Sequence, residues 1–143
     1  MQRHIFKPSY ELALPLVEVS KKKLKKLSLD DVLLIGLDRL DLILLDGDKM
    51  CANIQLKKLE NSYETEIIGL EEQTILSNDS KKYKALKLSF GTVKSKALEL
   101  GQNIDIKHLD LDRVKLVLKD TTIAEGSLVI VDEEIAVQIK KVN

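Results

Sequence analysis

The residues that could do chemistry in this chain are few and widely separated. His4 and His108 are the only histidines, and no Cys-x-x-Cys, His-Glu-x-x-His or glycine-rich phosphate loop accompanies them. Asp46 and Asp48 flank a glycine, but the remaining ligands of a calcium loop are missing, which favours a hairpin turn. The sequence therefore predicts no catalytic residues, no metal site and no cofactor, and it indicates that the protein is not an enzyme.

Lysines are concentrated in residues 21–26, where five of the six positions are lysine. Ser20 precedes them and is a suitable N-cap for a helix of one or two turns. The lysines could dock an acidic partner or anionic lipid, or they could be the solvated face of that helix. The inward position of Leu24 and the lack of an aromatic anchor favour the solvated face. Cys51, the single cysteine, is most simply a small strand residue.

The aliphatic run Leu128, Val129 and Ile130 is the best candidate for a partner-binding surface. A strand with one face on the core needs apolar side chains only at alternate positions, so three in a row imply that one points outward. The alternative is burial on both faces, under another part of the chain. If Val129 points outward, a polar residue at this position is expected to leave the fold intact. Loss of the fold would instead identify Val129 as a core residue.

Composition indicates a folded protein and limits its partners. Of the 143 residues, 44% are apolar and 32% charged, which allows a core and disfavours disorder. Lysine plus arginine balances aspartate plus glutamate at 23 each, and aromatic residues are scarce, so nucleic acid is not an expected partner. No apolar run reaches the length of a membrane-spanning helix and the start of the chain does not resemble a secretory signal, which predicts a soluble cytoplasmic protein.

The elements that must position these residues read as β-strands. Ile123 to Val142 forms two strands joined at residues 132–134, and the second strand alternates Ile135, Val137 and Ile139 with other residues. A further strand, with an irregularity near Pro15, covers residues 11–19. Other strands are predicted at residues 32–35, 40–45, 49–57 and 63–70, with a hairpin turn at residues 46–48.

The second half of the chain repeats the order of elements in the first. Leu111 to Asp120 matches Leu37 to Asp46, with Leu-Asp-Arg and the closing aspartate identical. Residues 93–100 take the place of the short helix, and Ile104 and Ile106 take the place of the strand at 32–35. We interpret the chain as a tandem duplication, with domains at 11–70 and 84–143 and a linker at 71–83. Alternating leucine and valine also recurs in any β protein, which is the alternative explanation.

The second half resembles the surface-presentation-of-antigens (SPOA) domain of the FliM/FliN flagellar motor switch family and of type III secretion injectisomes. The resemblance covers roughly residues 84–143. Its most specific part is Ile123 to Asp132, which reads aliphatic-Ala-x-Gly-x-aliphatic run-Asp, followed by Ala136-Val-x-Ile139. In the family pattern, Phe90-Gly91 would end a strand. The first half looks like a diverged copy, in which Ala52-Asn-Ile-Gln replaces the Ala-x-Gly block.

The resemblance implies a mainly β fold of two tandem intertwined SPOA-type domains, a pseudo-dimer within one chain. Each half is near the lower limit for an independent core, which is a reason to exchange strands. The resemblance also implies a non-enzymatic scaffold subunit of a bacterial cytoplasmic ring, at the cytoplasmic face of the inner membrane. It further implies that Leu128, Val129 and Ile130 dock a partner protein. On this basis a polar residue at Val129 should abolish partner binding with the fold intact, since apolar anchors dominate small interfaces.

The expected partners are other ring or switch subunits and the stalk protein that regulates the export ATPase, with self-association possible and no small-molecule substrate. Either the injectisome sorting platform or the flagellar motor switch fits, and the tandem arrangement favours secretion. The alternative is a small-ligand-binding or chemotaxis regulatory protein, which needs a concave apolar pocket with convergent polar groups.

Overall fold

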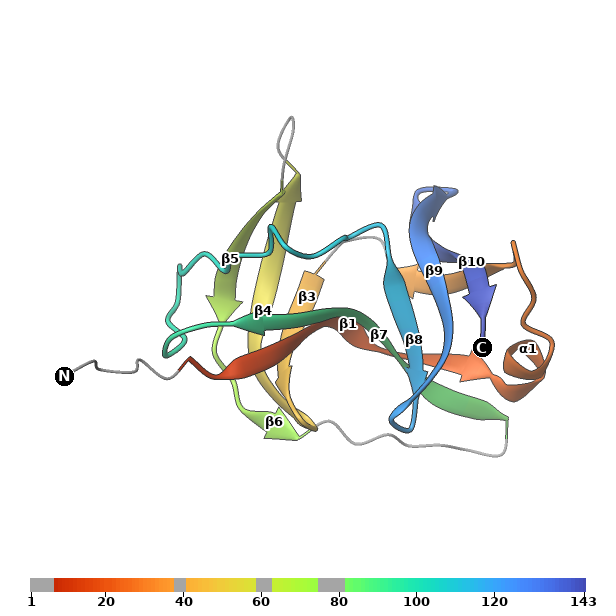
Figure 1. Ribbon diagram of the computed structural model, residues 1–143, viewed down its shortest axis with the longest axis horizontal. Helices are drawn as coiled ribbons and strands as arrows, with labels where there is room; N and C mark the ends of the chain where they lie inside the picture. Colours follow the sequence, from red (N-terminus) through yellow and green to blue (C-terminus); the bar gives the residue numbers. More distant parts are fainter. Residues whose placement is uncertain (1–6, 38–40, 59–62, 75–81) are drawn as a thin grey trace.

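The computed structural model describes residues 7–37, 41–58, 63–74 and 82–143, and these form a mainly β structure (Figure 1). One five-residue helix and ten strands are assigned within these ranges. His4 lies outside the described residues, as do Asp38 and Arg39 of the repeated Leu-Asp-Arg. The elements are β1 (Ser9–Ser20), α1 (Lys21–Lys25), β2 (Val32–Leu37), β3 (Asp41–Asp46), β4 (Lys49–Lys58), β5 (Tyr63–Gly69), β6 (Gln73–Thr74), β7 (Tyr83–Lys94), β8 (Val114–Leu118), β9 (Thr121–Val131) and β10 (Glu134–Val142).

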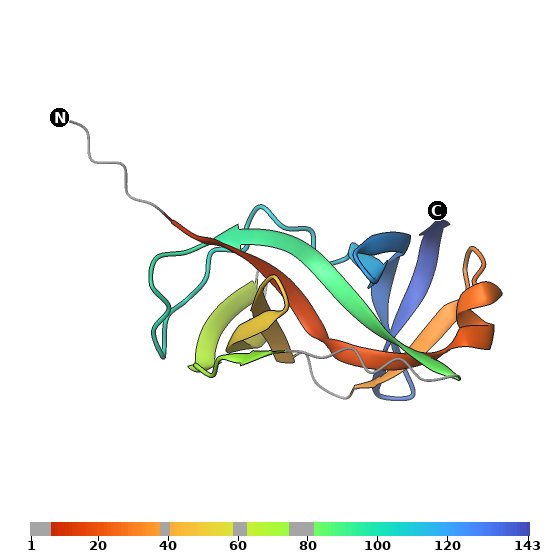
Figure 2. The ribbon, with the colours of Figure 1, turned by 90° about the horizontal axis from the view of Figure 1, so that it is seen from below.

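All described strands belong to one antiparallel sheet in the order β2-β10-β9-β8-β7-β1-β3-β4-β5, with β6 paired to β4. The two twelve-residue strands β1 and β7 run side by side through the middle (Figure 2). The strands β3, β4 and β5 lie towards one end, and β8, β9 and β10 towards the other (Figure 1). One hydrophobic cluster draws buried residues from both ends, so β1 and β7 carry a shared core.

The pairing of β1 with β7 is nearly symmetric about Leu14 and Leu88, which lie opposite each other. The pairing register shifts on either side of this pair. One shift lies between Leu14 and Val17 of β1, and the other lies between Leu12 and Ala13, where Phe90 is the extra residue on β7. The predicted irregularity near Pro15 is therefore confirmed. The expected strand end at Phe90-Gly91 is wrong, because Gly91, with φ of 120°, belongs to the bulge and β7 continues to Lys94.

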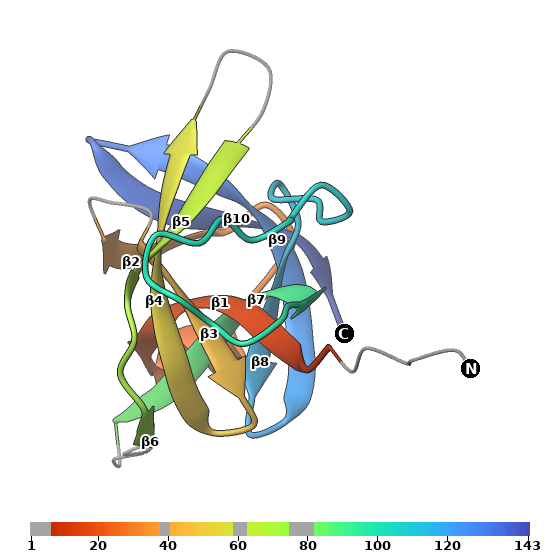
Figure 3. The ribbon, with the colours of Figure 1, turned by 90° about the vertical axis from the view of Figure 1, so that its left-hand side faces the viewer.

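Each half of the chain hydrogen-bonds the last strand of the other half. The segment that enters β2 pairs with β10: the Asp30 N–H donates to the Ile139 carbonyl at 2.8 Å, and the Ile139 N–H donates to the Asp31 carbonyl at 2.8 Å. Residues 101–106 meet β5 in the same way, since Gly101 N–H donates to the Ile67 carbonyl at 2.8 Å and Ile67 N–H to the Gln102 carbonyl at 2.9 Å. Figure 3 shows this connection between β7 and β8 passing along β5.

The short helix α1 follows Ser20 as predicted, although the Ser20 side chain makes no capping hydrogen bond. The second predicted helix, at residues 93–100, is wrong. The Ser95 N–H donates to the Pro8 carbonyl at 3.1 Å, which continues the β1–β7 pairing, and the Gln102 side chain bonds to Ser95 Oγ and Glu99 N–H. A segment of this length does not form a stable helix when its polar groups have other partners.

Two-residue turns close the predicted hairpin at residues 46–48 and a second hairpin, between β8 and β9, that was not predicted. Asp46 pairs with Lys49 around Gly47, as the Asp-Gly sequence indicates. In the second hairpin Leu118 pairs with Thr121, as Asp46 pairs with Lys49 in the first. Leu118 is therefore the structural counterpart of Asp46, whereas the ten-residue sequence match aligns Asp46 with Asp120, two residues later. Of the predicted linker at 71–83, Gln73–Thr74 forms β6, and residues 75–81 lie outside the described part of the chain.

Candidate docking surface

The three residues of the predicted binding run lie on β9 but point in different directions. β9 pairs with β10 from Val131 to Ala124, as the sequence predicts, around a turn in which Asp132 and Glu133 adopt left-handed φ values of 50° and 66°. Successive side chains on a strand point to opposite faces. The run therefore divides between the two faces of the sheet.

Leu128 belongs to the inner face. It is half-buried and packs against the main hydrophobic cluster. Its direct neighbour on β10 is Val137, and Leu33 of β2 follows in the same row. Both neighbours are buried, at 0% and 4% exposure. Leu128 therefore supports the core and is not the anchor of an exposed surface.

Val129 belongs to the opposite face, where it forms a row with Ala136 of β10 and Leu34 of β2. Val129 is half-buried, Ala136 is buried, and Leu34 is 54% exposed. Val32, two residues before Leu34 and 47% exposed, extends the same face. We call these four residues, Val32, Leu34, Val129 and Ala136, the outer aliphatic face. Its accessible part is supplied mainly by β2.

Ile130 is the most exposed member of the predicted run, at 70%. It shares a strand face with Leu128 and lies opposite Ile135, which is 3% exposed. Ile130 lies one residue before the end of β9, next to the turn, so the core ends beneath it. An exposed isoleucine beside the acidic hairpin tip of Asp132, Glu133 and Glu134 can dock an apolar partner side chain without rearrangement of the fold.

Val32 and Leu34 are not among the site residues predicted from the sequence, although a signal for them is present. Residues 32–35 are four consecutive aliphatic residues, as at 128–131. Leu33 and Ile35 are buried, at 4% and 9% exposure, while their two neighbours are open. Because a core needs apolar residues only at alternate positions of a strand, four in a row predict that two of residues 32–35 point away from the core. What this pattern could not give is the pairing that places β2 beside β10.

Gly126 holds β9 close to β10 at the base of the hairpin. A Cβ added there would lie 2.6 Å from the Gln138 carbonyl oxygen and 2.6 Å from Val137 Cγ1. Glycine is the residue that permits this approach. The counterpart of the Ala124-x-Gly126 block in the hairpin β3–β4 is Ala52-x-Ile54, because Ala52 faces Leu44 as Ala124 faces Leu116.

The polar residues considered for chemistry do not form a reactive cluster. His108 is exposed, and its Nε2 lies 2.9 Å from the Thr92 carbonyl. Burial, followed by the nearby Asp46 carboxylate, raises the pKa of the Cys51 thiol, which makes it a weaker nucleophile at neutral pH. Among the described residues, no group of three or more potential ligands could hold a metal ion. No helix in the described ranges is long and apolar enough to cross a membrane.

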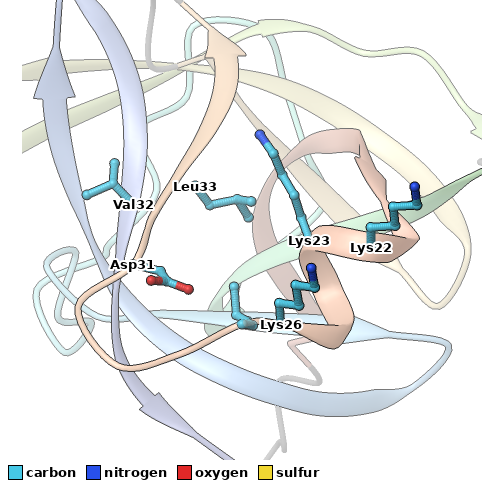
Figure 4. Close-up of a pocket in the computed structure, with 7 residues that line it drawn as sticks. Lys22, Lys23, Lys26, Asp31, Val32 and Leu33 are labelled. Atoms are coloured by element: carbon cyan, nitrogen blue, oxygen red, sulfur yellow. The ribbon is translucent and has the colours of Figure 1, made fainter.

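Two hollows flank α1. One, of about 390 Å³, has Lys22, Lys23 and Lys26 on the helix side, with residues 31–33 from the start of β2 opposite them (Figure 4). There the Asp31 carboxylate accepts a hydrogen bond from the Ser28 N–H at 2.8 Å. The other hollow lies on the side of α1 that faces the C-terminal end of β10. The predicted lysine segment therefore borders concave surface and not only open solvent.

The fold and these surfaces define a mainly antiparallel β protein with exposed aliphatic residues suited to protein contacts. No protein-family model matches the sequence, and no curated protein matches it.

Proposed function

We propose that this chain is a non-enzymatic scaffold subunit of a bacterial cytoplasmic ring, at the cytoplasmic face of the inner membrane. It would bind other ring subunits and the stalk protein that regulates the export ATPase. The proposal rests on the resemblance of residues 84–143 to SPOA domains and on the exposure of Leu34 and Ile130.

The finer fold proposal is a pair of tandem, intertwined SPOA-type domains, one per half. Its support is the reciprocal pairing described above, in which Asp30 and Gly101, both with left-handed φ, begin equivalent contacts with Ile139 and Ile67. The symmetry of β1 and β7 about Leu14 and Leu88 is a second observation in its favour. Duplication followed by strand exchange accounts for both, since it buries edges that each half alone would expose.

The docking proposal is carried by one observation, the exposure of aliphatic side chains at the β2–β10–β9 end of the sheet, with Leu34 of β2 on the outer face and Ile130 at the β9 tip on the inner face. Strands packed on a core hold such side chains in fixed positions, which lowers the entropic cost of binding. Apolar anchors of this kind supply much of the energy of a small interface. In this region Leu34 and Ile130 are the most exposed aliphatic residues, and Val129 lies in the same row as Leu34, with Ala136 between them.

Two machines fit this role, the injectisome sorting platform and the flagellar motor switch. The tandem arrangement favours the injectisome, because it is similar to that of injectisome ring proteins. The alternative, a small-ligand or chemotaxis regulator, would bind a metabolite or signalling protein instead. The identity of the co-purifying proteins distinguishes these possibilities.

The test is affinity purification of the tagged chain from its source organism, followed by mass spectrometry, with two variants in parallel. The double variant Leu34→Asp with Ile130→Asp removes the exposed aliphatic residues. The control is Leu100→Asp, whose side chain is 66% exposed in the connection between β7 and β8. Circular dichroism and thermal unfolding establish that all three proteins are folded.

We expect stalk and injectisome ring proteins with the wild type and the control, and their loss with the double variant. Flagellar rotor proteins in place of these would assign the chain to the motor switch. Capture of neither set would contradict the ring proposal. Equal capture by the folded double variant would contradict the assignment of the docking surface.

A further inference from the structure

The second hollow beside α1 is a groove with an apolar floor. It measures about 550 Å³, and its floor consists of Leu24, Leu27, Leu118, Ile123 and Val142. Val142 is 44% exposed, and the other four are half-buried and pack against the main hydrophobic cluster. We call this the α1 groove. Figure 1 shows α1 beside the C-terminal end of the chain. The groove floor is continuous with the core, so it keeps its shape without a partner.

The end of the chain is fixed at this groove. The Asn143 N–H donates to the Ile123 carbonyl at 3.0 Å, and Asn143 Nδ2 donates to the Thr122 carbonyl at 2.9 Å. At the other side, the Lys21 N–H donates to the Lys82 carbonyl at 2.9 Å, which attaches α1 to the strand entering β7. Both walls are therefore held by backbone hydrogen bonds.

The rim of the α1 groove is cationic. Lys21 and Lys25 project from α1, and Lys84 of β7 also lines the groove. The first turn of α1 contains no acidic residue, and within the described part of the chain no ion pair joins a lysine of residues 21–26 to a carboxylate. Lys22, Lys23 and Lys26 add charge along the opposite side of the helix (Figure 4). This local excess contrasts with a chain of zero formal net charge.

An apolar floor and a cationic rim together complement an amphipathic segment with acidic residues. We propose that the α1 groove binds such a segment of a partner protein, with aliphatic side chains on the floor and carboxylates against Lys21, Lys25 and Lys84. Helices bind grooves of this kind through apolar residues on one face. The opposed charges steer association and set the orientation of the segment.

A protein segment fits this groove better than a membrane does. Membrane-binding surfaces present protruding apolar or aromatic anchors that enter the lipid, whereas Leu24 and Leu27 are turned inward and residues 21–26 contain no aromatic residue. The floor is recessed, so a planar lipid surface would contact the lysines and leave the apolar floor unoccupied. A narrow peptide reaches both.

The α1 groove is a different site from the outer aliphatic face and the β9 tip. Ile123 and Ile130 lie seven residues apart on β9, on the order of 20 Å along the strand. Val142 lies at one end of β10, while Glu134 beside the hairpin turn lies at the other. This inference therefore does not depend on the proposed ring function, and the two surfaces can be tested separately.

The experiment measures binding of a fluorescein-labelled synthetic helix with leucines on one face and glutamates on the other. A second peptide carries glutamine in place of every glutamate. The full chain is compared with the triple variant K21E/K25E/K84E and with the charge-matched control K94E/K96E/K107E. The three control lysines are exposed and lie outside the groove, at the far end of β7 and in the connection that follows it. Two-dimensional NMR of the wild type locates the bound peptide. Vesicles of phosphatidylcholine with phosphatidylserine test the lipid alternative.

We expect the glutamate peptide to bind, and K21E/K25E/K84E to weaken it about tenfold or more, with an effect of about twofold or less for the control. The glutamine peptide should bind about tenfold more weakly, and amide shifts should centre on α1, Leu118, Ile123 and Val142. If charge reversal unfolds the protein, K21Q/K25Q/K84Q takes its place with the same expected direction.

Three results would overturn the inference. Equal weakening by both triple variants would show a response to net charge alone. Shifts centred on Leu34 and Ile130 would move the peptide to the other surface. Vesicle binding that depends on Lys21, Lys25 and Lys84, without peptide binding, would make the site a lipid contact.

Discussion

A buried hydroxyl adds two hydrogen bonds to the backbone contacts between residues 101–106 and β5. Thr65 is 2% exposed; its Oγ1 donates to the Ile104 carbonyl at 2.7 Å and accepts from the Ile104 N–H at 2.9 Å. Thr65→Val keeps the shape but leaves both Ile104 groups without this partner. We expect the free energy of unfolding in urea to fall by about 1–3 kcal/mol. The matched variant Thr92→Val, at an exposed strand position, should change it by less than about 0.5 kcal/mol. Equal effects would contradict a special role for Thr65.

Cys51 provides a pH-dependent prediction. Burial first, and the Asp46 carboxylate second, raise the pKa of its thiol. Because the thiolate is the reactive form, alkylation by iodoacetamide should require a higher pH than it does for a free cysteine. Asp46→Asn removes the negative charge and should lower the pH at which the alkylation rate reaches half of its maximum. A midpoint that stays unchanged in this variant would exclude the carboxylate as a cause.

The residue scale also shows where prediction from sequence succeeded and where it failed. The aliphatic run predicts that one of its residues points outward, with Val129 as the expected anchor. In the structure Ile130 is the exposed residue, Leu128 packs against the core and Val129 is half-buried. Alternation identifies two faces of a strand, and it cannot tell how far the core extends beneath each face. Ile130 is open because the hairpin ends there, which depends on the rest of the sheet.

At the scale of elements, β9 and β10 can approach closely because residue 126 is glycine. In Gly126→Ala the new methyl group would lie 2.6 Å from a backbone oxygen, so a strand must move. We expect a loss of about 1–3 kcal/mol in unfolding free energy, measured by urea denaturation. Gly69→Ala is the control, since its nearest neighbour, at 3.1 Å, is the end of the Asn53 side chain, which can rotate away. A smaller loss at Gly126 than at Gly69 would contradict this account.

The positions of the strands could be predicted from the sequence, but the conformation of the connection between β7 and β8 could not. Period-two patterns and turn residues identified β1, β4, β9 and β10, since those signals are local. The helix expected at residues 93–100 was inferred by analogy with α1. In the structure the Gln102 side chain donates to Ser95 Oγ and accepts from the Glu99 N–H. A helix would place Ser95 and Gln102 about 10 Å apart along its axis, so this contact excludes a helix between them.

At the scale of the whole molecule, the sequence could predict strands but not their partners. Nothing in residues 32–37 indicates pairing with β10, more than ninety residues later, and nothing in 101–106 indicates contact with β5. Local alternation predicts which face of a strand a residue occupies, whereas the pairing of strands depends on contacts between distant parts of the chain. The repeat and the family resemblance supplied the expectation of exchange, and the hydrogen bonds of Asp30 and Gly101 now support it.

Exchange predicts that the halves of the chain need each other. A first fragment ending in the predicted linker loses the 101–106 segment that covers β5, and the second fragment loses β2 from the edge of β10. Each would expose backbone groups and apolar side chains that the intact sheet buries. We expect each fragment alone to be unfolded or aggregated, and co-expressed fragments to purify together in equal amounts. Fragments that are separately stable, monomeric and non-associating would refute the intertwined arrangement.

Two adjacent leucines make this experiment specific for β2. Leu33 is 4% exposed and lies against Val137 of β10, whereas Leu34 is 54% exposed on the opposite face. Leu33→Asp in the first fragment should abolish co-purification, because it introduces a charge into the shared core. Leu34→Asp adds the same charge one residue away and should leave association of the fragments intact. If Leu33→Asp leaves association intact as well, the fragments associate through contacts other than the inner face of β2, namely the pairing of β1 with β7 or of residues 101–106 with β5.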